Sequence, residues 1–244
     1  MRIVIAGPPK AGNVWLKCLL ASIYDLQALG PKRSPERPTL EAFQTWVGQD
    51  QFKDGTVFHQ HYSYSVELAD AIAAVPAHIV TIVRDPYDMF VSSFSTIQKH
   101  ADGPRAKRRK VDILGGKPLD HPDVIAWLQR GGFENSLVKA SQWVGSGRTS
   151  VVHYEALMAD PLAELTRLSE RIEAASPERI AGAVEGCSAD SMRQNSRTAG
   201  HVRVAKVGDS RARLTASHLE IFHDRYAELI RSLGYDVRDP ASAS

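Results

Sequence analysis

The chain has 244 residues, 43% of them hydrophobic, which is long enough to bury one sizeable core in a single domain. Its 30 basic and 28 acidic side chains nearly cancel, so the overall charge does not favour nucleic acid or a membrane surface as a partner. No stretch approaches the roughly 20 apolar residues that span a membrane. Cys18 and Cys187 lie far apart and form no metal-ligand cluster, which favours buried, reduced thiols in a cytoplasmic protein.

The first element that we expect is a buried parallel strand at residues 3–6, because an apolar run there ends at Gly7 and Pro8. After this turn, apolar residues recur at helical spacing over residues 14–26. A strand, a tight turn and a helix in this order are typical of the start of an α/β nucleotide-binding fold. Residues 30–56 are richer in proline and polar side chains and are expected to lie outside the core.

Three elements are predicted next: a strand at residues 56–61, a short helix at residues 67–75 and the clearest buried strand at residues 78–83. A helix should then run to about residue 98. Asp85 can cap this helix, Pro86 can occupy its first turn, and Asp88 complements the positive end of its dipole.

Basic side chains and glycines dominate residues 99–117, which are expected to form a mobile loop. The later elements expected are helices at 122–130 and 134–144, a strand at 150–154, a helix at 161–174, a second mobile basic loop at 193–213 and a closing helix at 215–233. The fold class predicted for residues 1–244 is α/β: one domain with a central parallel β-sheet flanked by helices, like a P-loop nucleotide hydrolase.

The turn after the first strand has the two-glycine spacing of a Walker loop, from Gly7 to Gly12. In nucleoside triphosphatases a lysine follows the second glycine, and a serine or threonine after it binds Mg²⁺. Here Asn13 and Val14 occupy those positions, and valine cannot bind magnesium. The lysine lies inside the loop, at Lys10. This pattern favours an anion held by backbone N–H groups and side-chain donors without a metal, with a plain chain-reversing turn as the alternative.

Two motifs resemble those of the sulfotransferase family, whose donor is 3′-phosphoadenosine 5′-phosphosulfate (PAPS). The family's 5′-phosphosulfate loop reads Pro-Lys-Ser/Ala-Gly-Thr/Asn-Thr-Trp-Leu, and residues 9–16 read Pro-Lys-Ala-Gly-Asn-Val-Trp-Leu. The family's 3′-phosphate element is a strand followed by Arg-Asn/Asp-Pro, with a serine eight residues after the arginine. Arg84 and Ser92 have that spacing. The chain is therefore identified as a member of this family.

Three further segments are similar to family motifs but depart from them. The family has Lys-Thr-His at a strand end, and residues 59–61 read His-Gln-His, so that only His61 matches. Tyr154 begins a segment similar to the family's Tyr-Glu-Asp-Leu. The late motif Arg-Lys-Gly-x-x-Gly-Asp-Trp is matched by Arg203 and by a Gly-Asp pair within residues 203–210, but not by its lysine, first glycine or tryptophan.

The resemblance implies transfer of a sulfuryl group from PAPS to a hydroxyl acceptor by metal-free in-line displacement, with adenosine 3′,5′-bisphosphate (PAP) as product. Such a reaction needs positioning and stabilisation of charge on the leaving phosphate, a role that suits Lys10. His61 is the predicted general base, and His59 is the fallback. The residues predicted to bind the donor are Lys10, Ala11, Gly12, Asn13 (also through its side-chain amide), Val14, Trp15, Arg84, Ser92, Tyr154 and Arg203.

The resemblance implies a bacterial enzyme whose acceptor is a small molecule or a carbohydrate. The sequence does not decide whether the protein forms a homodimer. Trp15 and Tyr154 have an alternative interpretation as core residues. A metal site at the His-x-His pair is disfavoured because no further ligand stands at a suitable spacing.

One alternative function is a P-loop kinase or nucleoside triphosphatase, against which Asn13 and Val14 argue. The other is a non-catalytic nucleic-acid-binding protein, which the near-zero net charge disfavours.

Overall fold

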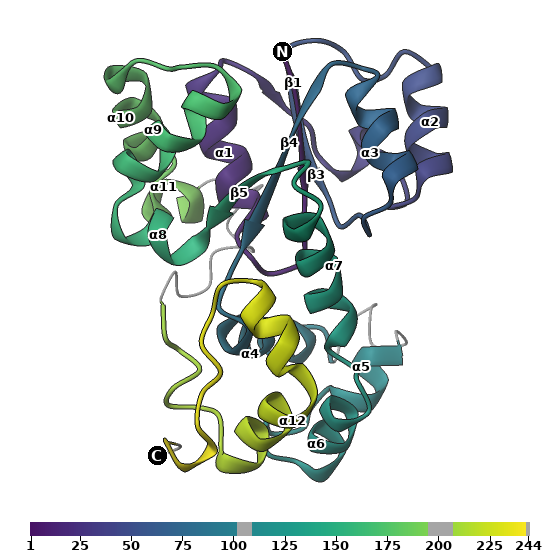
Figure 1. Ribbon diagram of the computed structural model, residues 1–244, viewed down its shortest axis with the longest axis vertical. Coiled ribbons are helices and arrows are strands. Elements are labelled where there is room, and N and C mark those ends of the chain that lie inside the picture. The colour runs from purple at the N-terminus through teal and green to yellow at the C-terminus, as the bar shows by residue number, and fades with distance from the viewer. Residues whose placement is uncertain (102–108, 195–206, 243–244) are drawn as a thin grey trace. The chain divides into compact units, whose positions relative to one another are not determined.

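A computed structural model describes three stretches of the chain, residues 1–101, 109–194 and 207–242 (Figure 1). Within them, five strands form one sheet and helices make up most of the remainder. The predicted α/β class, with a central parallel sheet flanked by helices, is confirmed. No helix in these stretches combines the length and the apolar character needed to cross a membrane.

The chain divides into two compact units. The first, here called the sheet unit, comprises Met1–Arg84 and Gln142–Ala205. The second, here called the helical unit, comprises Asp85–Ser141 and Lys206–Ser244. Every strand of the described residues belongs to the sheet unit.

The sheet has the strand order β2-β3-β1-β4-β5, and all of its pairs are parallel. Its strands are β1 (Arg2–Ala6), β2 (Gln27–Ala28), β3 (Thr56–Gln60), β4 (Ala77–Val83) and β5 (Ser150–His153). The central strand β1 is almost wholly buried, as expected for a parallel strand covered on both faces. It pairs with β3 on one side and β4 on the other, so the carboxyl ends of these strands lie at the same edge.

Helices cover both faces of this sheet. The helices of the sheet unit are α1 (Asn13–Ile23), α2 (Leu40–Gly48), α3 (Val66–Ala73), α8 (Tyr154–Ala159), α9 (Pro161–Ile172), α10 (Pro177–Gly186) and α11 (Ala189–Gln194). Figure 1 shows α1 and α8 to α11 on one side of the strands and α2 and α3 on the other. Between α2 and the sheet, an aromatic cluster that includes Phe43, Trp46 and Phe58 forms much of the core.

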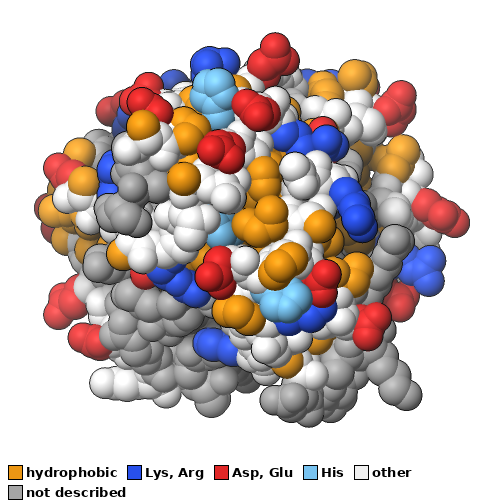
Figure 2. All heavy atoms as spheres, turned by 90° about the horizontal axis from the view of Figure 1, so that it is seen from below, with side chains coloured by type: hydrophobic (Ala, Val, Ile, Leu, Met, Phe, Trp, Pro, Cys, Tyr) orange, Lys and Arg blue, Asp and Glu red, His pale blue; other side chains and the backbone are white. Residues whose placement is uncertain are grey.

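The helical unit is built from α4 (Pro86–Gln98), α5 (Arg109–Leu114), α6 (Pro122–Gln129), the first part of α7 (Glu134–Gly145), α12 (Ala216–Ser232) and the 3₁₀ turn η2 (Pro240–Ser242). Aromatic rings hold α4 to α12: the ring centroids of Tyr87 and Phe222 are 4.5 Å apart. As predicted, Asp85 caps α4, since its carboxylate accepts from the N–H groups of Tyr87 and Asp88. On the face shown in Figure 2, acidic and basic side chains are interspersed among hydrophobic ones.

Most of the predicted elements are confirmed to within a few residues, and the differences have physical causes. The segment 30–56 contains α2, because Phe43 and Trp46 are three residues apart and both face the core. The sequence prediction also missed α10. In the loop predicted at 99–117, Arg109–Leu114 is helical, and the helix Ala189–Gln194 overlaps only the start of the loop predicted at 193–213. Residues 102–108 and 195–206 lie outside the described residues.

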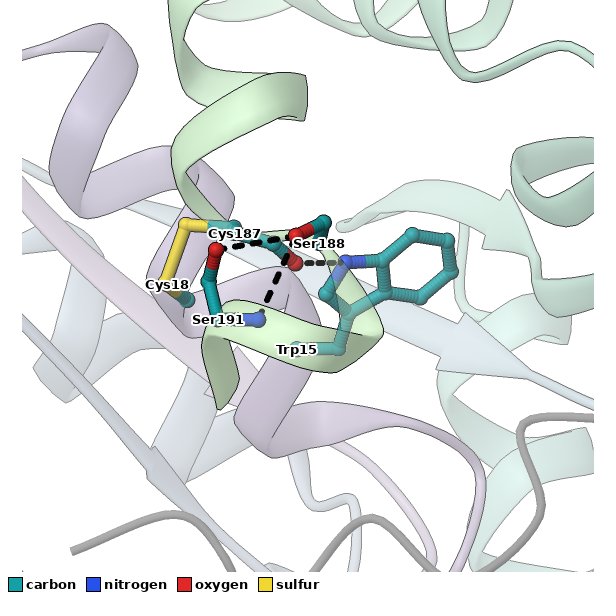
Figure 3. Close-up of a disulfide and its surroundings, with 5 residues drawn as sticks. All are labelled: Trp15, Cys18, Cys187, Ser188 and Ser191. Carbon is teal, nitrogen blue, oxygen red and sulfur yellow. Dashed lines mark hydrogen bonds between the residues drawn. A yellow bond between two sulfur atoms is a disulfide. The ribbon is translucent and has the colours of Figure 1, made fainter. Parts of the chain in front are cut away.

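Cys18 and Cys187 form a disulfide (Figure 3). The prediction of two separate reduced thiols was therefore wrong. A sequence separation of 169 residues hides the pairing, which arises because α1, carrying Cys18, packs against α10, which Cys187 caps. Close by, the indole N–H of Trp15 donates to the carbonyl oxygen of Cys187 over 3.0 Å. The end of α10 is thus tied to the first turns of α1 by a covalent bond and a hydrogen bond.

Removing this disulfide should destabilise the protein by about 2–5 kcal/mol, because the cross-link closes a long loop and restricts the unfolded chain. We expect dithiothreitol to lower the Tm of the wild-type protein. A double variant, Cys18→Ser with Cys187→Ser, should have a low Tm that dithiothreitol does not change. Thermal unfolding of both proteins with and without the reductant measures this. A wild-type Tm that is insensitive to the reductant would contradict the assignment.

Candidate active site

The loop that joins β1 to α1, called the phosphate loop (residues 7–13), restricts which residues fit it. Lys10 has a φ of 71° and Gly12 a φ of 113°, in the left-handed region that L-residues rarely adopt. At Gly12, a Cβ atom would also lie 2.8 Å from Cδ2 of Tyr154. Glycine is therefore required there for both conformation and space. Lys10 instead keeps a strained backbone that costs about 1–2 kcal/mol, and such strain is concentrated at functional sites.

The first turn of α1 suits a bound anion. Gly12 is the N-cap residue and supplies no side-chain acceptor, and the first turn contains no acidic side chain. No carboxylate of that turn therefore offsets the positive end of the helix dipole or occupies its N–H groups. Ala11 is fully buried, and Val14 is partly exposed.

Asn13 has a structural task that the sequence did not indicate. Its side chain is buried, and its amide group donates to the carbonyl oxygen of Pro8 over 2.8 Å. This bond joins the two ends of the phosphate loop. One of the two N–H donors of this amide group, which we expected to reach the cofactor, is thus used to shape the loop.

His61 is oriented by the phosphate loop. It follows the last residue of β3, and the pairing of Ala6 with Gln60 places it level with Gly7. Its Nδ1 lies 3.0 Å from the carbonyl oxygen of Gly7. Because a carbonyl only accepts hydrogen bonds, Nδ1 carries the proton of the neutral ring, and the lone pair is on Nε2. This is the tautomer that a general base acting through Nε2 requires.

His59 lies in β3, two residues before His61. The centroids of the two rings are 5.9 Å apart, in agreement with the prediction that both side chains face the same way. The hydrogen bond to the phosphate loop is made by His61, and this favours His61 over His59 as the base.

Arg84 follows β4 directly and stacks on an aromatic ring. Its guanidinium carbon lies 4.4 Å from the ring centroid of Tyr154, a cation–π arrangement. Tyr154 is the first residue of α8, and the parallel pairing of Val83 with His153 brings the two residues side by side. The Tyr154 ring also makes a T-shaped contact with Trp15, with centroids 5.9 Å apart and an angle of 72° between the ring planes. Trp15 is thus held by this ring as well as by its bond to Cys187.

The predicted site residues of the sheet unit converge because they follow four parallel strands. The phosphate loop follows β1, His61 follows β3, Arg84 follows β4 and Tyr154 follows β5. In open α/β sheets, ligands bind at this carboxyl edge. Of the other two predicted residues, Ser92 is a partly exposed residue of α4 in the helical unit, and Arg203 is outside the described residues.

A polar network at the start of α4 was not anticipated. Asp88, expected only to complement the helix dipole, is 1% exposed and accepts from the backbone N–H groups of Gly208 (2.7 Å) and Ser210 (2.9 Å). The guanidinium of Arg238 donates to Asp85 and to the hydroxyl of Ser210, both over 2.9 Å. The Gly-Asp pair of the late family motif was the one sequence signal for this network. It anchors the residues that follow the undescribed segment 195–206 to the beginning of α4.

A family model described as "Sulfotransferase domain" matches residues 1–234. The chain belongs to the sulfotransferase family. The predicted enzyme class, a PAPS-dependent sulfotransferase, is thereby confirmed. No curated protein sequence matches this sulfotransferase.

Solved structures with the same fold include mouse sulfotransferase SULT7A1 complexed with PAP. It is 16% identical, with a TM-score of 0.70 over 94% of this chain and 84% of that chain. A retinol dehydratase in complex with androsterone and inactive cofactor PAP is 14% identical, with a TM-score of 0.63 over 98% of this chain and 83% of that chain. At these identities the likeness concerns the fold, and it confirms the predicted P-loop-like architecture.

The strain at Lys10 can be measured with two variants that both lose its charge. Lys10→Gly removes the left-handed strain, whereas Lys10→Ala retains it, so the glycine variant should be more stable than the alanine variant by about 0.5–1 kcal/mol. Both should lose sulfuryl transfer. Urea unfolding gives the free energies of unfolding. A glycine variant less stable than the alanine variant would show that residue 10 does not adopt this backbone.

Proposed function

We propose that this sulfotransferase binds PAPS along the carboxyl edge of its sheet and transfers the sulfuryl group to the hydroxyl of a small molecule. The observation that carries the proposal is the hydrogen bond between His61 and Gly7. It links a histidine in the tautomer of a general base to the loop that suits the donor's 5′-phosphosulfate. The base that takes the acceptor's proton would then lie next to the sulfuryl group that is transferred.

The 5′ end of the donor is assigned to the phosphate loop. Backbone N–H groups of Gly12 and Asn13 would bind the 5′-phosphate, supported by the uncapped start of α1. Lys10 would neutralise charge on the oxygen that bridges phosphorus and sulfur as the S–O bond breaks. Trp15 would lie beside the adenine. Because Val14 stands where a magnesium ligand would be needed, we propose that these groups act without a metal.

The 3′-phosphate is assigned to Arg84. Its guanidinium has N–H donors in a plane, which suits bidentate binding of a phosphate, and its carbon lies over the ring of Tyr154. Ser92 is proposed as a second donor on the strength of its spacing from Arg84 in the family motif. Arg203 is proposed as a third on the same ground. Tyr154 is proposed to belong to the same donor site, through the ring over which Arg84 lies.

His61 is proposed to take the proton of the acceptor hydroxyl. The O–H bond breaks as its proton passes to Nε2, the acceptor oxygen forms a bond to sulfur, and the bond from sulfur to the phosphate oxygen breaks. The negative charge leaves on PAP, next to Lys10. General-base assistance of this kind is worth about 10²–10⁴ in rate.

The acceptor class is proposed from chemistry and from one structural neighbour. Structures of retinol dehydratase contain androsterone or retinol, small molecules with hydroxyl groups. A small-molecule alcohol or phenol is therefore our proposal for this chain. A carbohydrate acceptor and a homodimer stay predictions. A screen of phenols, aliphatic alcohols and sugars with labelled PAPS distinguishes the acceptor classes.

The donor assignment is tested by the binding of PAP in the presence of EDTA. PAP should raise the Tm of the wild-type protein, and Arg84→Ala should weaken PAP binding by about 10–100-fold, because a charge-assisted hydrogen bond is lost. Arg148→Ala is the matched control, since Arg148 makes a surface ion pair with Asp70 in the same unit. It should bind PAP like the wild type. If PAP leaves the wild-type Tm unchanged, the donor assignment fails.

The base assignment is tested by comparing two neighbouring histidines. His61→Ala should reduce sulfuryl transfer by at least about 100-fold while changing the Kd of PAP only slightly. His59→Ala should retain most of the transfer. Turnover is followed as labelled product from PAPS with the acceptor panel, and PAP binding by calorimetry. Activity lost in the His59 variant and kept in the His61 variant would reverse the assignment.

A further inference from the structure

We propose that Tyr154 is a positioning residue whose ring holds Arg84 in place for the 3′-phosphate and ties it to the phosphate loop. This inference rests on the proposed function. In this inference, the enzyme's preference for a nucleotide with a 3′-phosphate over one without it depends on the ring face of Tyr154. The ring acts through Arg84 and not through a contact of its own with the nucleotide.

The ring lies between the two ends of the proposed donor site. Tyr154 is 6% exposed. On one side it supports Arg84, with 4.4 Å between guanidinium carbon and ring centroid. On another it lies so close to Gly12 that a Cβ atom there would be 2.8 Å from the ring. One side chain therefore spans from the phosphate loop to the arginine.

The backbone of Tyr154 is held independently of any ligand. It follows β5, and β5 is paired with β4 up to the residues immediately before Tyr154 and Arg84. The edge-on contact with Trp15 restricts the ring further. The platform under Arg84 is thus part of the sheet's architecture and is present before the donor arrives.

Such a platform matters because a free arginine loses much rotamer freedom when it binds a phosphate. Stacking on an aromatic face removes part of that freedom in advance, and prior ordering of this kind increases affinity. The guanidinium carbon lies over the ring, and a cation–π contact of this kind does not consume the N–H donors that a phosphate needs.

The test compares PAP with adenosine 5′-phosphate, which lacks the 3′-phosphate. The readout is the ratio of their Kd values, measured by calorimetry on the wild type, Tyr154→Phe and Tyr154→Leu. Phenylalanine keeps the ring face, so its ratio should match the wild type. Leucine fills space without a π face, so PAP should bind about 3–30-fold more weakly, whereas the Kd of adenosine 5′-phosphate should change much less.

A ring that only fills the core predicts a different outcome. Loss of Tyr154 would then weaken both nucleotides equally and leave the ratio unchanged, and this result would overturn the inference. An Arg84→Ala background supplies the control: if the ring acts through Arg84, Tyr154→Leu should have no further effect on the ratio there.

If Tyr154→Leu does not fold, phenylalanines of increasing fluorination at position 154 replace it in the test. These keep the shape of the ring while weakening its attraction for a cation, so the Kd of PAP relative to that of adenosine 5′-phosphate should rise stepwise with fluorination. A constant ratio would overturn the inference. Failure of the wild type to bind PAP at all would instead reject the proposed function, so the two failures are distinguishable.

Discussion

In a parallel sheet the strands of each pair end at the same edge, and in this chain β1 pairs with β3 and β4 while β4 pairs with β5. The residues that follow β1, β3, β4 and β5 therefore lie at the same edge of the sheet, although they are far apart in the sequence. The hydrogen bond from His61 to Gly7 and the stacking of Arg84 on Tyr154 both follow from this register. A slip of one residue would turn the side chains of a strand to the opposite face and separate these pairs.

Local signals explain what could be predicted from the sequence. The phosphate loop and the capped start of α4 each depend on residues close together in the chain, so both could be predicted from the local sequence. The roles of Asn13 and Tyr154 depend on contacts with distant or backbone groups, and no local pattern encodes them. The disulfide was missed for the same reason, since 169 residues separate its cysteines. The acceptor stays a prediction because loops rather than regular elements shape its site.

The Arg-Asp-Pro motif divides its work between the two units. Arg84 ends the first segment of the sheet unit and makes a cation–π contact with Tyr154. Asp85 is the first residue of the helical unit, caps α4 and binds Arg238. The motif is thus at once a proposed phosphate-binding element and the structural beginning of the helical unit. These two roles give a physical reason for the arginine at position 84 and for the aspartate at position 85.

The disulfide also gives the chain a covalent topology. The bond between Cys18 and Cys187 closes a ring that contains β2 to β5 and α2 to α10, while β1 and the phosphate loop belong to the short arm before it. A single proteolytic cut between the two cysteines would open the ring without releasing either piece. β1 is nevertheless the middle strand, flanked by β3 and β4 of the ring. The segment that carries Lys10 therefore lies between two strands of the ring. A single cut of the backbone between Cys18 and Cys187 would leave both strands covalently linked to it.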